Sequence, residues 1–470
     1  MRTSHNTLLP KDQETIVALA TPQGSGAIAL VRLSGVDVIR VVDSIAQLSS
    51  NKSLASVDSH TINHGFVVDQ QRTKLDEVLF LLMRAPKTFT GQDTIEISCH
   101  NNPFIIENII QAAIAAGARH AGPGEFTMRG FLYGKFDLTQ AEAINEIIHA
   151  PSEKALQSAL AQLKGSLSQR FTAVETSIIE LLTLCEASFE FLEEEQRDLN
   201  FTTLVHEKIQ NLLAELQDIK KHFNAQQRIK DGIRIALIGS VNAGKSSLFN
   251  ALLGKNRAIV TSMAGTTRDS IEANLYKGGY FWLLIDTAGL RQTGDFIEQQ
   301  GIERSYEEAL KADLVLLVID SSRTMTAEEK VMYSRIAIDH AAKTLVVLNK
   351  IDLPILLKRD FPPIAHLQAF SVSTDQNIGL TELEDAIAKK IESLFHLQQT
   401  SFVLSHRQFN LMGEIEKKLL YIESSLTSQV HYELVAYELK DLLEKVCELT
   451  GKHISEEILD TVFTKFCIGK

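Results

Sequence analysis

Short apolar runs alternate with turn residues over the first 120 residues of the chain. Short runs bounded by turn residues are typical of strands, whereas a longer run with helical spacing is typical of a helix. We therefore expect strands at 15–20, 27–35, 78–83 and 93–100 and a helix at 104–118. This mixture predicts an α+β domain over residues 1–127.

From Leu138 the apolar residues recur at steps of three and four, which is the pattern of long packed helices. A first stripe consists of Leu156, Leu160, Leu163, Leu167, Phe171, Val174, Ile178 and Leu181. A second stripe consists of Val435, Leu439, Leu442, Val446 and Leu449. We expect one all-α domain made of residues 128–227 and 393–470 and split in the sequence by an inserted domain. Two unrelated helical segments are the alternative.

The inserted stretch, residues 228–392, has a different pattern. Apolar runs expected to be strands alternate with helical stretches, and these runs cover 235–239, 281–286, 314–320, 344–349 and 368–373. Strands that alternate with helices predict a parallel sheet with crossover helices, which is an α/β domain.

Composition adds limits to this picture. A chain of 470 residues is expected to form about three domains. Its net charge of -12 argues against a protein that binds nucleic acid through a general basic surface, although a local basic patch or a basic partner stays open. The four cysteines have no C-x-x-C spacing, which argues against a zinc site or a disulfide framework.

The sequence also bears on location. No run of 18 apolar residues and no apolar leader segment occurs, so we expect a soluble protein without a membrane span. Few cysteines without a pairing pattern favour a reducing compartment. Together these features predict a cytoplasmic protein.

A glycine-rich loop follows the expected strand at 235–239. Gly239, Gly244, Lys245 and Ser246 form the pattern G-x-x-x-x-G-K-[ST], and a helical pattern begins directly after it. The backbone N–H groups of such a loop bind phosphate, the lysine reaches the β/γ-phosphates, and the serine binds Mg²⁺. An ordinary glycine loop is the alternative, but the position between a strand and a helix favours phosphate binding.

Further nucleotide motifs follow in order. Asp286–Gly289 (DTAG) ends a strand, where the aspartate holds Mg²⁺ through water and the glycine N–H meets the γ-phosphate. Asn349–Asp352 (NKID) selects guanine, because the Asp352 carboxylate accepts from the ring N1–H and the 2-amino group. Ser371–Ser373 are expected near the guanine O6. These motifs predict a GTP-binding domain. Leu290 stands where Ras-like enzymes have a water-orienting glutamine, so another group must take that role.

Charged residues also follow or precede turns outside this domain. Arg32 lies in a strand after a Gly-Ser-Gly turn, Glu96 lies in another strand, and Glu125 and Arg129 lie in a glycine-rich segment. Solvated charges beside turns are the alternative. The chain ends in Cys467-Ile468-Gly469-Lys470, which suggests a reactive thiol, with a disordered tail as the alternative.

These motifs together resemble the MnmE (TrmE) family of tRNA-modifying GTPases. The resemblance covers the whole chain and rests on residues 20–35, 123–143, 239–253, 259–269, 286–305 and 466–470. It implies an N-terminal domain similar to tetrahydrofolate-binding domains, a helical domain, and an inserted Ras-like P-loop G domain. It also implies a homodimer formed through the N-terminal domains, with G domains that associate when GTP and K⁺ are bound.

The resemblance assigns roles around the nucleotide. Asn242 would ligate K⁺ with Thr261, Met263 and Thr266, and Ser246 and Thr267 would bind Mg²⁺. Glu298 would position the hydrolytic water as a catalytic residue. The residues expected to bind GTP are Asn242, Ala243, Gly244, Lys245, Ser246, Ser247, Thr261, Ser262, Met263, Ala264, Gly265, Thr266, Thr267, Asp286, Thr287, Ala288, Gly289, Asn349, Lys350, Asp352, Ser371, Val372 and Ser373.

The resemblance also assigns the remaining charged residues. Arg32, Glu96, Arg129 and Lys470 match positions that bind 5-formyltetrahydrofolate, and Cys467 matches the catalytic cysteine required for modification. One departure affects this site: the family commonly has G-H-G-G where this chain has Cys99-His100-Asn101-Asn102, so the loop loses glycine freedom.

The implied function is a K⁺-dependent GTPase that acts with the FAD-dependent MnmG (GidA) protein in a heterotetramer. It would add a carboxymethylaminomethyl or aminomethyl group to C5 of the wobble uridine of certain tRNAs, using a one-carbon unit from a tetrahydrofolate derivative. One alternative is a regulatory or ribosome-assembly GTPase without modification chemistry, which needs neither the folate-matching residues nor the terminal cysteine. A folate-dependent one-carbon enzyme with a regulatory G domain is the other.

Overall fold

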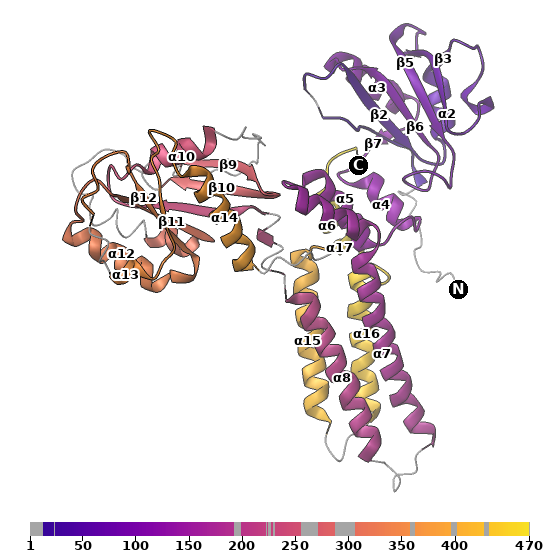
Figure 1. The fold of residues 1–470 in the computed structure, drawn as a ribbon. Helices are drawn as coiled ribbons and strands as arrows, with labels where there is room; N and C mark the ends of the chain where they lie inside the picture. The colour runs from indigo at the N-terminus through magenta and orange to yellow at the C-terminus, as the bar shows by residue number, and fades with distance from the viewer. Residues whose placement is uncertain are drawn as a thin grey trace. The chain divides into compact units, whose positions relative to one another are not determined.

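The computed structural model describes residues 13–22, 24–191, 199–221, 223, 227–228, 231–254, 271–286, 306–357, 362–395, 402–426 and 432–469. The chain forms two compact units (Figure 1). Unit 1 comprises Met1–Ile148, Gln162–Leu216 and Asn410–Lys470, and unit 2 comprises His149–Ala161 and Gln217–Phe409. Each unit is described by itself.

Unit 1 contains a seven-stranded sheet in the order β3-β4-β5-β6-β2-β1-β7. Its strands are β1 (Ile16–Leu19), β2 (Ile28–Ser34), β3 (Ala46–Leu48), β4 (Thr61–Val68), β5 (Lys74–Met83), β6 (Thr94–His100) and β7 (Arg119–His120). Pairing is antiparallel except between β1 and β7. The four strands expected from the sequence are therefore confirmed as β1, β2, β5 and β6, whereas β3, β4 and β7 were not expected.

Two helices pack on one face of this sheet, α2 (Val38–Ile45) and α3 (Pro103–Ala115), with a short 3₁₀ helix η1 (Leu54–Ser56) beside α2. Their apolar side chains form one core with alternate residues of β2, β5 and β6. Side chains of a strand alternate between faces, so Arg32 and Glu96, which are paired across β2 and β6, point to the opposite face. The sheet thereby places two candidate site residues away from the core.

The helices of unit 1 are α4 (Glu125–Leu132), α5 (Leu138–His149), α7 (Ser166–Phe191), α8 (Leu199–Lys220), α15 (His406–Ser425), α16 (Tyr432–Thr450) and α17 (Glu456–Phe463). Helices α7 and α16 pack against each other, although the G-domain sequence separates them (Figure 1). The predicted stripe of α16 is buried from Val435 to Leu449, and Leu167 and Phe171 of α7 are fully buried. The two helical segments therefore form one bundle, and the alternative of unrelated segments is wrong.

One part of the first stripe was interpreted wrongly. A separate helix, α6 (Glu153–Leu163), precedes α7, and Gly165 interrupts the helical path with φ of 96°. Leu160 is 41% exposed, so it is not part of the bundle core. The break changes the direction of the apolar face, and Ala155 of α6 packs into the core of unit 2 instead.

Unit 2 contains a six-stranded sheet in the order β13-β12-β11-β8-β10-β9. Its strands are β8 (Ile233–Ile238), β9 (Ile271–Lys277), β10 (Tyr280–Asp286), β11 (Leu314–Asp320), β12 (Thr344–Asn349) and β13 (Ala369–Ser371). The five expected strands are confirmed and parallel. The additional strand β9 is antiparallel to β10, because Gly278 and Gly279 both have positive φ and close a two-residue hairpin.

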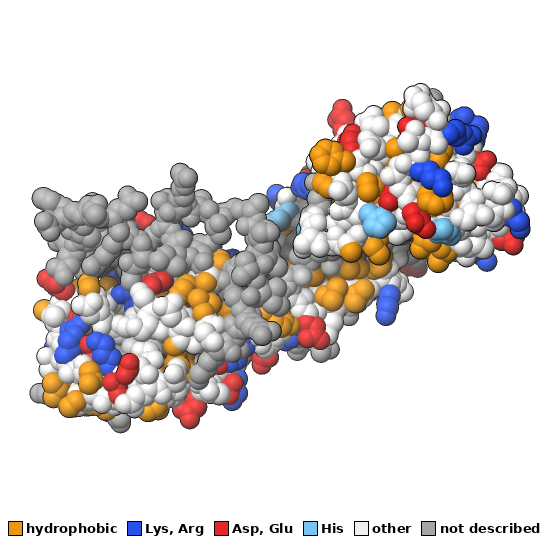
Figure 2. Space-filling view, turned by 90° about the horizontal axis from the view of Figure 1, so that it is seen from above, with side chains coloured by type: hydrophobic (Ala, Val, Ile, Leu, Met, Phe, Trp, Pro, Cys, Tyr) orange, Lys and Arg blue, Asp and Glu red, His pale blue; other side chains and the backbone are white. Residues whose placement is uncertain are grey.

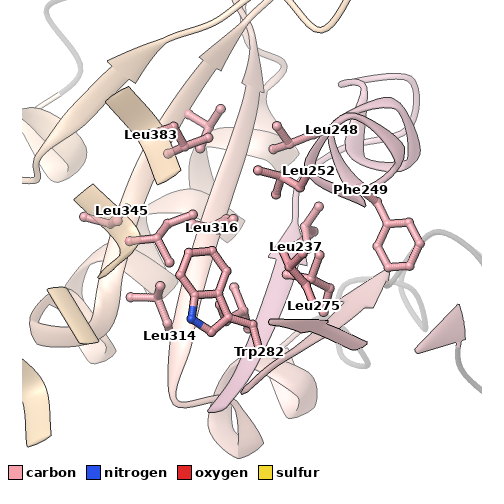
Figure 3. Close-up of a cluster of buried hydrophobic side chains, with 14 of the residues drawn as sticks. Leu237, Leu248, Phe249, Leu252, Leu275, Trp282, Leu314, Leu316, Leu345 and Leu383 are labelled. Carbon is pink, nitrogen blue, oxygen red and sulfur yellow. The ribbon is translucent and has the colours of Figure 1, made fainter. Parts of the chain in front are cut away.

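Helices cover both faces of this sheet. Helices α10 (Lys245–Gly254) and α14 (Leu380–Phe395) pack on one face, where Trp282, Leu316 and Leu248 belong to a continuous apolar core (Figure 3). Helix α12 (Ala327–Asp339) packs on the other face through Tyr333 and Ile336. The remaining short helices are η3 (Ala341–Lys343) and α13 (Pro362–Ala365). Burial of parallel strands on both faces is typical of this fold class.

The surface agrees with the acidic composition. On the face that Figure 2 shows, Lys and Arg side chains of the described residues lie among Asp and Glu side chains rather than in one basic tract. Among the helices that the structure describes, none has the length and apolarity needed to cross a membrane.

The buried stripe of α16 can be tested with two leucines of the same helix. Leu439 is fully buried and Leu434 is 65% exposed. We expect Leu439→Ala to lower the free energy of unfolding by about 2–5 kcal/mol, because it leaves a cavity in the bundle. Leu434→Ala should change it by less than about 0.5 kcal/mol. Urea unfolding of the full chain, followed by helical circular dichroism, measures both; equal effects would contradict the assigned face.

Candidate functional site

The loop between β8 and α10 requires glycine at two positions. A Cβ atom at Gly239 would lie 2.2 Å from the carbonyl oxygen of Val318 in the neighbouring strand. Gly244 has φ of +92°, and a Cβ atom there would lie 2.1 Å from Nδ2 of Asn349. A side chain at either position would push the loop away from the sheet edge. The loop is therefore held against the carboxyl ends of the strands.

The polar side chains of this loop are already oriented. Lys245 Nζ donates to the carbonyl oxygens of Gly239 (2.8 Å) and Ser240 (2.7 Å). Ser246 Oγ donates to Asp286 Oδ2 at 2.7 Å, which brings the hydroxyl of the loop to the carboxylate at the end of β10. Hydroxyl and carboxylate oxygens are the ligands that Mg²⁺ prefers. The pair therefore fits a magnesium ion at the phosphate end of the loop.

The guanine motif lies on the same edge of the sheet. Asn349 Nδ2 donates to the carbonyl oxygen of Ala243 at 3.0 Å, so the end of β12 is tied directly to the phosphate loop. Asp352 Oδ1 accepts from Ser373 Oγ at 2.5 Å, which joins the aspartate to the segment after β13. Val372 is fully buried between them. The structure thus brings the phosphate motif and the two proposed guanine motifs together.

Asp320, at the end of β11, was given no role from the sequence. Its Oδ2 accepts from Lys350 Nζ at 2.7 Å. Burial raises the pKa of the Asp320 carboxyl, but hydrogen bonds from Lys350 and Ser322 outweigh it, so the pKa lies below its ordinary value. The available signal was a polar residue at the carboxyl end of a buried strand, as at Asp286 and Asn349.

Other predicted residues are placed differently. Asn242, proposed as a K⁺ ligand, lies in the loop with φ of 63° and is exposed, as are Ser246 and Ser247. The following predicted residues lie outside the described residues: Thr261, Ser262, Met263, Ala264, Gly265, Thr266, Thr267, Thr287, Ala288, Gly289, Glu298 and Lys470. Their roles stay predictions.

A second group of predicted residues meets in unit 1. Arg32 forms an ion pair with Glu96, with Nη2 2.8 Å from Oε1. Its Nη1 donates to the carbonyl oxygen of Gly469 at 3.2 Å, across 437 positions of sequence. The guanidinium also lies 5.8 and 5.7 Å from the ring centroids of Phe89 and Phe126. The end of the chain therefore returns to the N-terminal domain, as a site shared by Arg32 and the terminal residues requires.

Arg129 has a different environment from Arg32. Its side chain is fully buried, and it donates to Glu125 Oε1 at 2.9 Å, to Gln92 Oε1 at 2.9 Å and to the carbonyl oxygen of Glu14 at 2.7 Å. Arg119 also binds Glu125, at 2.6 and 2.8 Å. The alternative of solvated charges is wrong for these residues. Direct contact of Arg129 with folate stays a prediction. In the structure Arg129 joins α4 to Gln92 and to the Glu14 backbone.

The buried Glu125 carboxylate organises this segment. Burial raises the pKa of Glu125, but hydrogen bonds from Arg119 and the Gly122 N–H and the charge of Arg129 outweigh it, so the pKa lies below the ordinary value. The same contacts raise the pKa of Arg119. Both groups are therefore charged at neutral pH, and their pairing fixes the start of α4.

The start of α4 supports the C-terminal segment. Gly124 has φ of +64° and its N–H donates to the carbonyl oxygen of Cys467 at 3.3 Å. A Cβ atom at Gly124 would lie 2.6 Å from the carbonyl oxygen of Phe463. The segment is held by its backbone, and Cys467 itself is exposed. The alternative of a disordered tail is therefore wrong up to Gly469.

The loop that departs from G-H-G-G is stabilised in another way. Asn102 has φ of −115° and caps α3 by accepting from the Phe104 N–H. Asn101 Nδ2 donates to the carbonyl oxygens of Gly24 (3.0 Å) and Gly26 (2.8 Å). His100 keeps an exposed ring, with Nδ1 2.8 Å from Asp76 Oδ1. The asparagines therefore stabilise this loop by side-chain hydrogen bonds, whereas glycines would give it backbone conformational freedom.

Two family models match the chain, one over its N-terminal domain and one over nearly all of the rest. The sequence matches the family described as "GTP-binding protein TrmE N-terminus" over residues 15–135 and the family described as "MnmE helical domain" over residues 138–467. The chain belongs to the MnmE family.

Relatives of the MnmE family match the chain from end to end. A protein of Lactiplantibacillus plantarum named "tRNA modification GTPase MnmE" is 37% identical and covers 97% of this chain and 98% of its own length. A protein of Chlamydia pneumoniae with the same name is 40% identical, covering 97% and 99%. Among solved structures, the G domain of the T. maritima FeoB iron transporter is 30% identical over 34% of this chain and 98% of its own, with a TM-score of 0.26.

The close approach at Gly244 yields a prediction. Gly244→Ala combines a left-handed φ with a clash against Asn349, so it should disturb the loop by about 2–3 kcal/mol. We expect fluorescent GDP to bind roughly 30- to 150-fold more weakly. Gly254→Ala, where a Cβ atom would meet nothing within 4 Å, is the matched control and should bind normally. Unchanged affinity of the Gly244 variant would show that nucleotide binds elsewhere.

Proposed function

We propose that the chain is a K⁺-dependent GTPase that, with the FAD-dependent MnmG (GidA) protein, modifies C5 of the wobble uridine of certain tRNAs. The added group is carboxymethylaminomethyl or aminomethyl, and the reaction takes place in the cytoplasm. The proposal is carried by two contacts in one MnmE-family chain: in unit 2 the contact of Asn349 with the phosphate loop, and in unit 1 the contact of Arg32 with Gly469, two residues after the exposed Cys467.

The GTPase half uses the edge of the parallel sheet. Lys245 binds the β- and γ-phosphates, and Asp352 reads the guanine. Ser246 and Thr267 bind Mg²⁺, supported by the contact of Ser246 with Asp286. Thr261, Met263 and Thr266 complete the K⁺ site with Asn242. Glu298 orients the attacking water, since Leu290 has no polar group for that task.

K⁺ supplies charge that other GTPases obtain from an arginine. The transition state of phosphoryl transfer places negative charge on the phosphate oxygens, and a cation beside them stabilises it. Asn242 offers an amide oxygen from an exposed position in the phosphate loop, which supports this role. GTP hydrolysis is therefore the step that K⁺ accelerates.

The modification half uses the outer face of the sheet in unit 1. Arg32, Glu96, Arg129 and Lys470 bind a tetrahydrofolate derivative, which supplies the one-carbon unit. Arginine and lysine suit the carboxylates of its glutamate tail, and Glu96 suits the donor edge of the pterin. The ion pair of Arg32 with Glu96 and the contact of Arg32 with Gly469 support a shared site. Cys467 presents its thiol at this site as the residue required for modification.

Assembly is part of the proposal. The chain forms a homodimer through its N-terminal domains and a heterotetramer with MnmG. Ile28, Ile62 and Phe104 of that domain are 66%, 67% and 80% exposed, and covering such apolar side chains in a dimer would be favourable. The domain limits at residues 127, 227 and 392 are part of the same proposal.

The K⁺ role is tested by changing the cation. We expect GTP hydrolysis to be about 10²-fold faster in KCl than in NaCl, a size typical of a charge-stabilising group. Asn242→Ala should remove the K⁺ stimulation and leave GDP binding largely intact. Phosphate release measured in both salts gives the result, and equal rates for the unaltered chain would refute a cation role.

The cysteine site is tested through Gly124. Gly124→Ala places a methyl group against Phe463 and displaces the segment that carries Cys467. We expect wobble-uridine modification to fall about tenfold or more, since a free-energy cost of about 1.4 kcal/mol for holding the segment in place has that effect. Mass spectrometry of tRNA nucleosides from a complemented deletion strain measures it. K⁺-stimulated GTP hydrolysis should not change.

Two controls accompany this variant. Gly134→Ala has the same kind of strain, with φ of +67°, but its Cβ atom would meet nothing within 4 Å, so modification should persist. Cys467→Ser should abolish modification outright. Normal modification by the Cys467 variant would overturn the proposed chemistry, whereas normal modification by the Gly124 variant alone would overturn only the proposed support.

A further inference from the structure

Ser240, the first residue after Gly239 of the phosphate loop, is held at three of its atoms. Its N–H donates to the Tyr333 hydroxyl at 3.1 Å. Its Oγ accepts from Arg323 Nη2 at 3.0 Å. Its carbonyl oxygen accepts from Lys245 Nζ at 2.7 Å. Tyr333 and Arg323 therefore hold the N–H and the side chain of this residue, and Lys245 binds its carbonyl oxygen.

Arg323 is itself fixed by carboxylates. It binds Glu329 through both terminal nitrogens, with Nη1 3.0 Å from Oε2 and a second contact from Nη2 to Oε1. Glu329 also closes the capping box of α12 with Thr326. Arg323 Nε lies 3.8 Å from Asp320 Oδ2, the same oxygen that binds Lys350 of the guanine motif. A planar guanidinium in such a fork has little freedom to rotate.

Tyr333 is equally constrained. It lies in α12, is 1% exposed, and belongs to the apolar core between α12 and the sheet. Its hydroxyl is therefore presented to Ser240 from a packed ring with few available rotamers. Burial raises the pKa of Tyr333, so the hydroxyl stays protonated at neutral pH.

We propose that Arg323 and Tyr333 are positioning residues for Lys245, which act by fixing the backbone conformation at Ser240 and with it the two carbonyl oxygens that Lys245 binds. A lysine ammonium on a four-carbon stem has many rotamers, and the carbonyls of Gly239 and Ser240 select one. The Gly239 backbone is set by its close approach to β11. Ser240 lies outside any strand or helix, and besides the Ala243 N–H, which donates to its carbonyl oxygen at 3.3 Å, its hydrogen bonds given above are to the side chains of Tyr333, Arg323 and Lys245. The inference rests on the proposed contact of Lys245 with the β- and γ-phosphates.

The test separates phosphate contacts from base contacts. Affinities of GTP, GDP and GMP are measured by competition against fluorescent GDP for Tyr333→Phe and Arg323→Gln. Each variant should bind GTP and GDP roughly threefold to tenfold more weakly, the size of one lost hydrogen bond. GMP has no β-phosphate for Lys245 to reach, so its affinity should not change. Arg323→Lys, which keeps one donor toward Ser240, should restore part of the loss.

Tyr306→Phe is the matched control. This change also removes a hydrogen-bonded hydroxyl from unit 2, because Tyr306 donates to Asp339 at 2.6 Å. Asp339 is the last residue of α12, at the other end of the helix from Glu329, which binds Arg323. Its nucleotide affinities should equal those of the unaltered chain. Equal weakening for GTP, GDP and GMP, or no weakening, would overturn the positioning role alone. Equal affinity of the unaltered chain for GTP and GMP would instead overturn the proposed role of Lys245, and this inference with it.

Discussion

Parallel strands bring their carboxyl ends to one edge of a sheet, and the nucleotide site depends on this constraint. Strands β8, β10, β11 and β12 end at Ile238, Asp286, Asp320 and Asn349 in adjacent register. Residues at these strand ends can therefore contact the phosphate loop from far away in the sequence, as Asn349 contacts Ala243 across 106 positions. The phosphate loop fits against this edge only because Gly239 and Gly244 let the backbone approach so closely. Helix α12 then stabilises the loop from the other side of the sheet. The phosphate loop, the Ser246–Asp286 pair and the proposed guanine motif thus all lie at one edge.

In unit 1, too, backbone atoms make contacts between parts of the chain that are far apart in sequence, here the N-terminal domain and the C-terminal segment. The C-terminal segment offers carbonyl oxygens to the Gly124 N–H and to Arg32. These backbone contacts therefore fix where the exposed Cys467 lies. The buried Glu125 carboxylate binds Arg119 and Arg129, and these contacts fix the start of α4, which contacts the C-terminal segment.

How far the sequence predicts this structure depends on the range of the interaction. Strands such as β8, β11 and β12 are continuous apolar runs and were predicted, as was the buried face of α16 from Val435 onward. Strand β4 was missed because Asn63, His64 and Gly65 interrupt its apolar pattern, and its pairing with β5 stabilises it instead. The nucleotide motifs are local in sequence, and their convergence at Asn349 and the phosphate loop was predictable. The burial of Arg129 was not, because it depends on Gln92 and Glu14, which are far away in the sequence.

The contact between Arg32 and Gly469 also has a consequence for the order of folding. Chains are synthesised from the N-terminus, and domains generally fold as they emerge. Residues 149–161 and 217–409 form a compact unit with its own core, so the nucleotide site can be complete before residues 410–470 are made. The cysteine site needs the first strands and the last residues together, and it closes a loop of 437 positions. A chain that ended short of residue 467 could therefore form the nucleotide site but not the contact of Arg32 with the C-terminal segment.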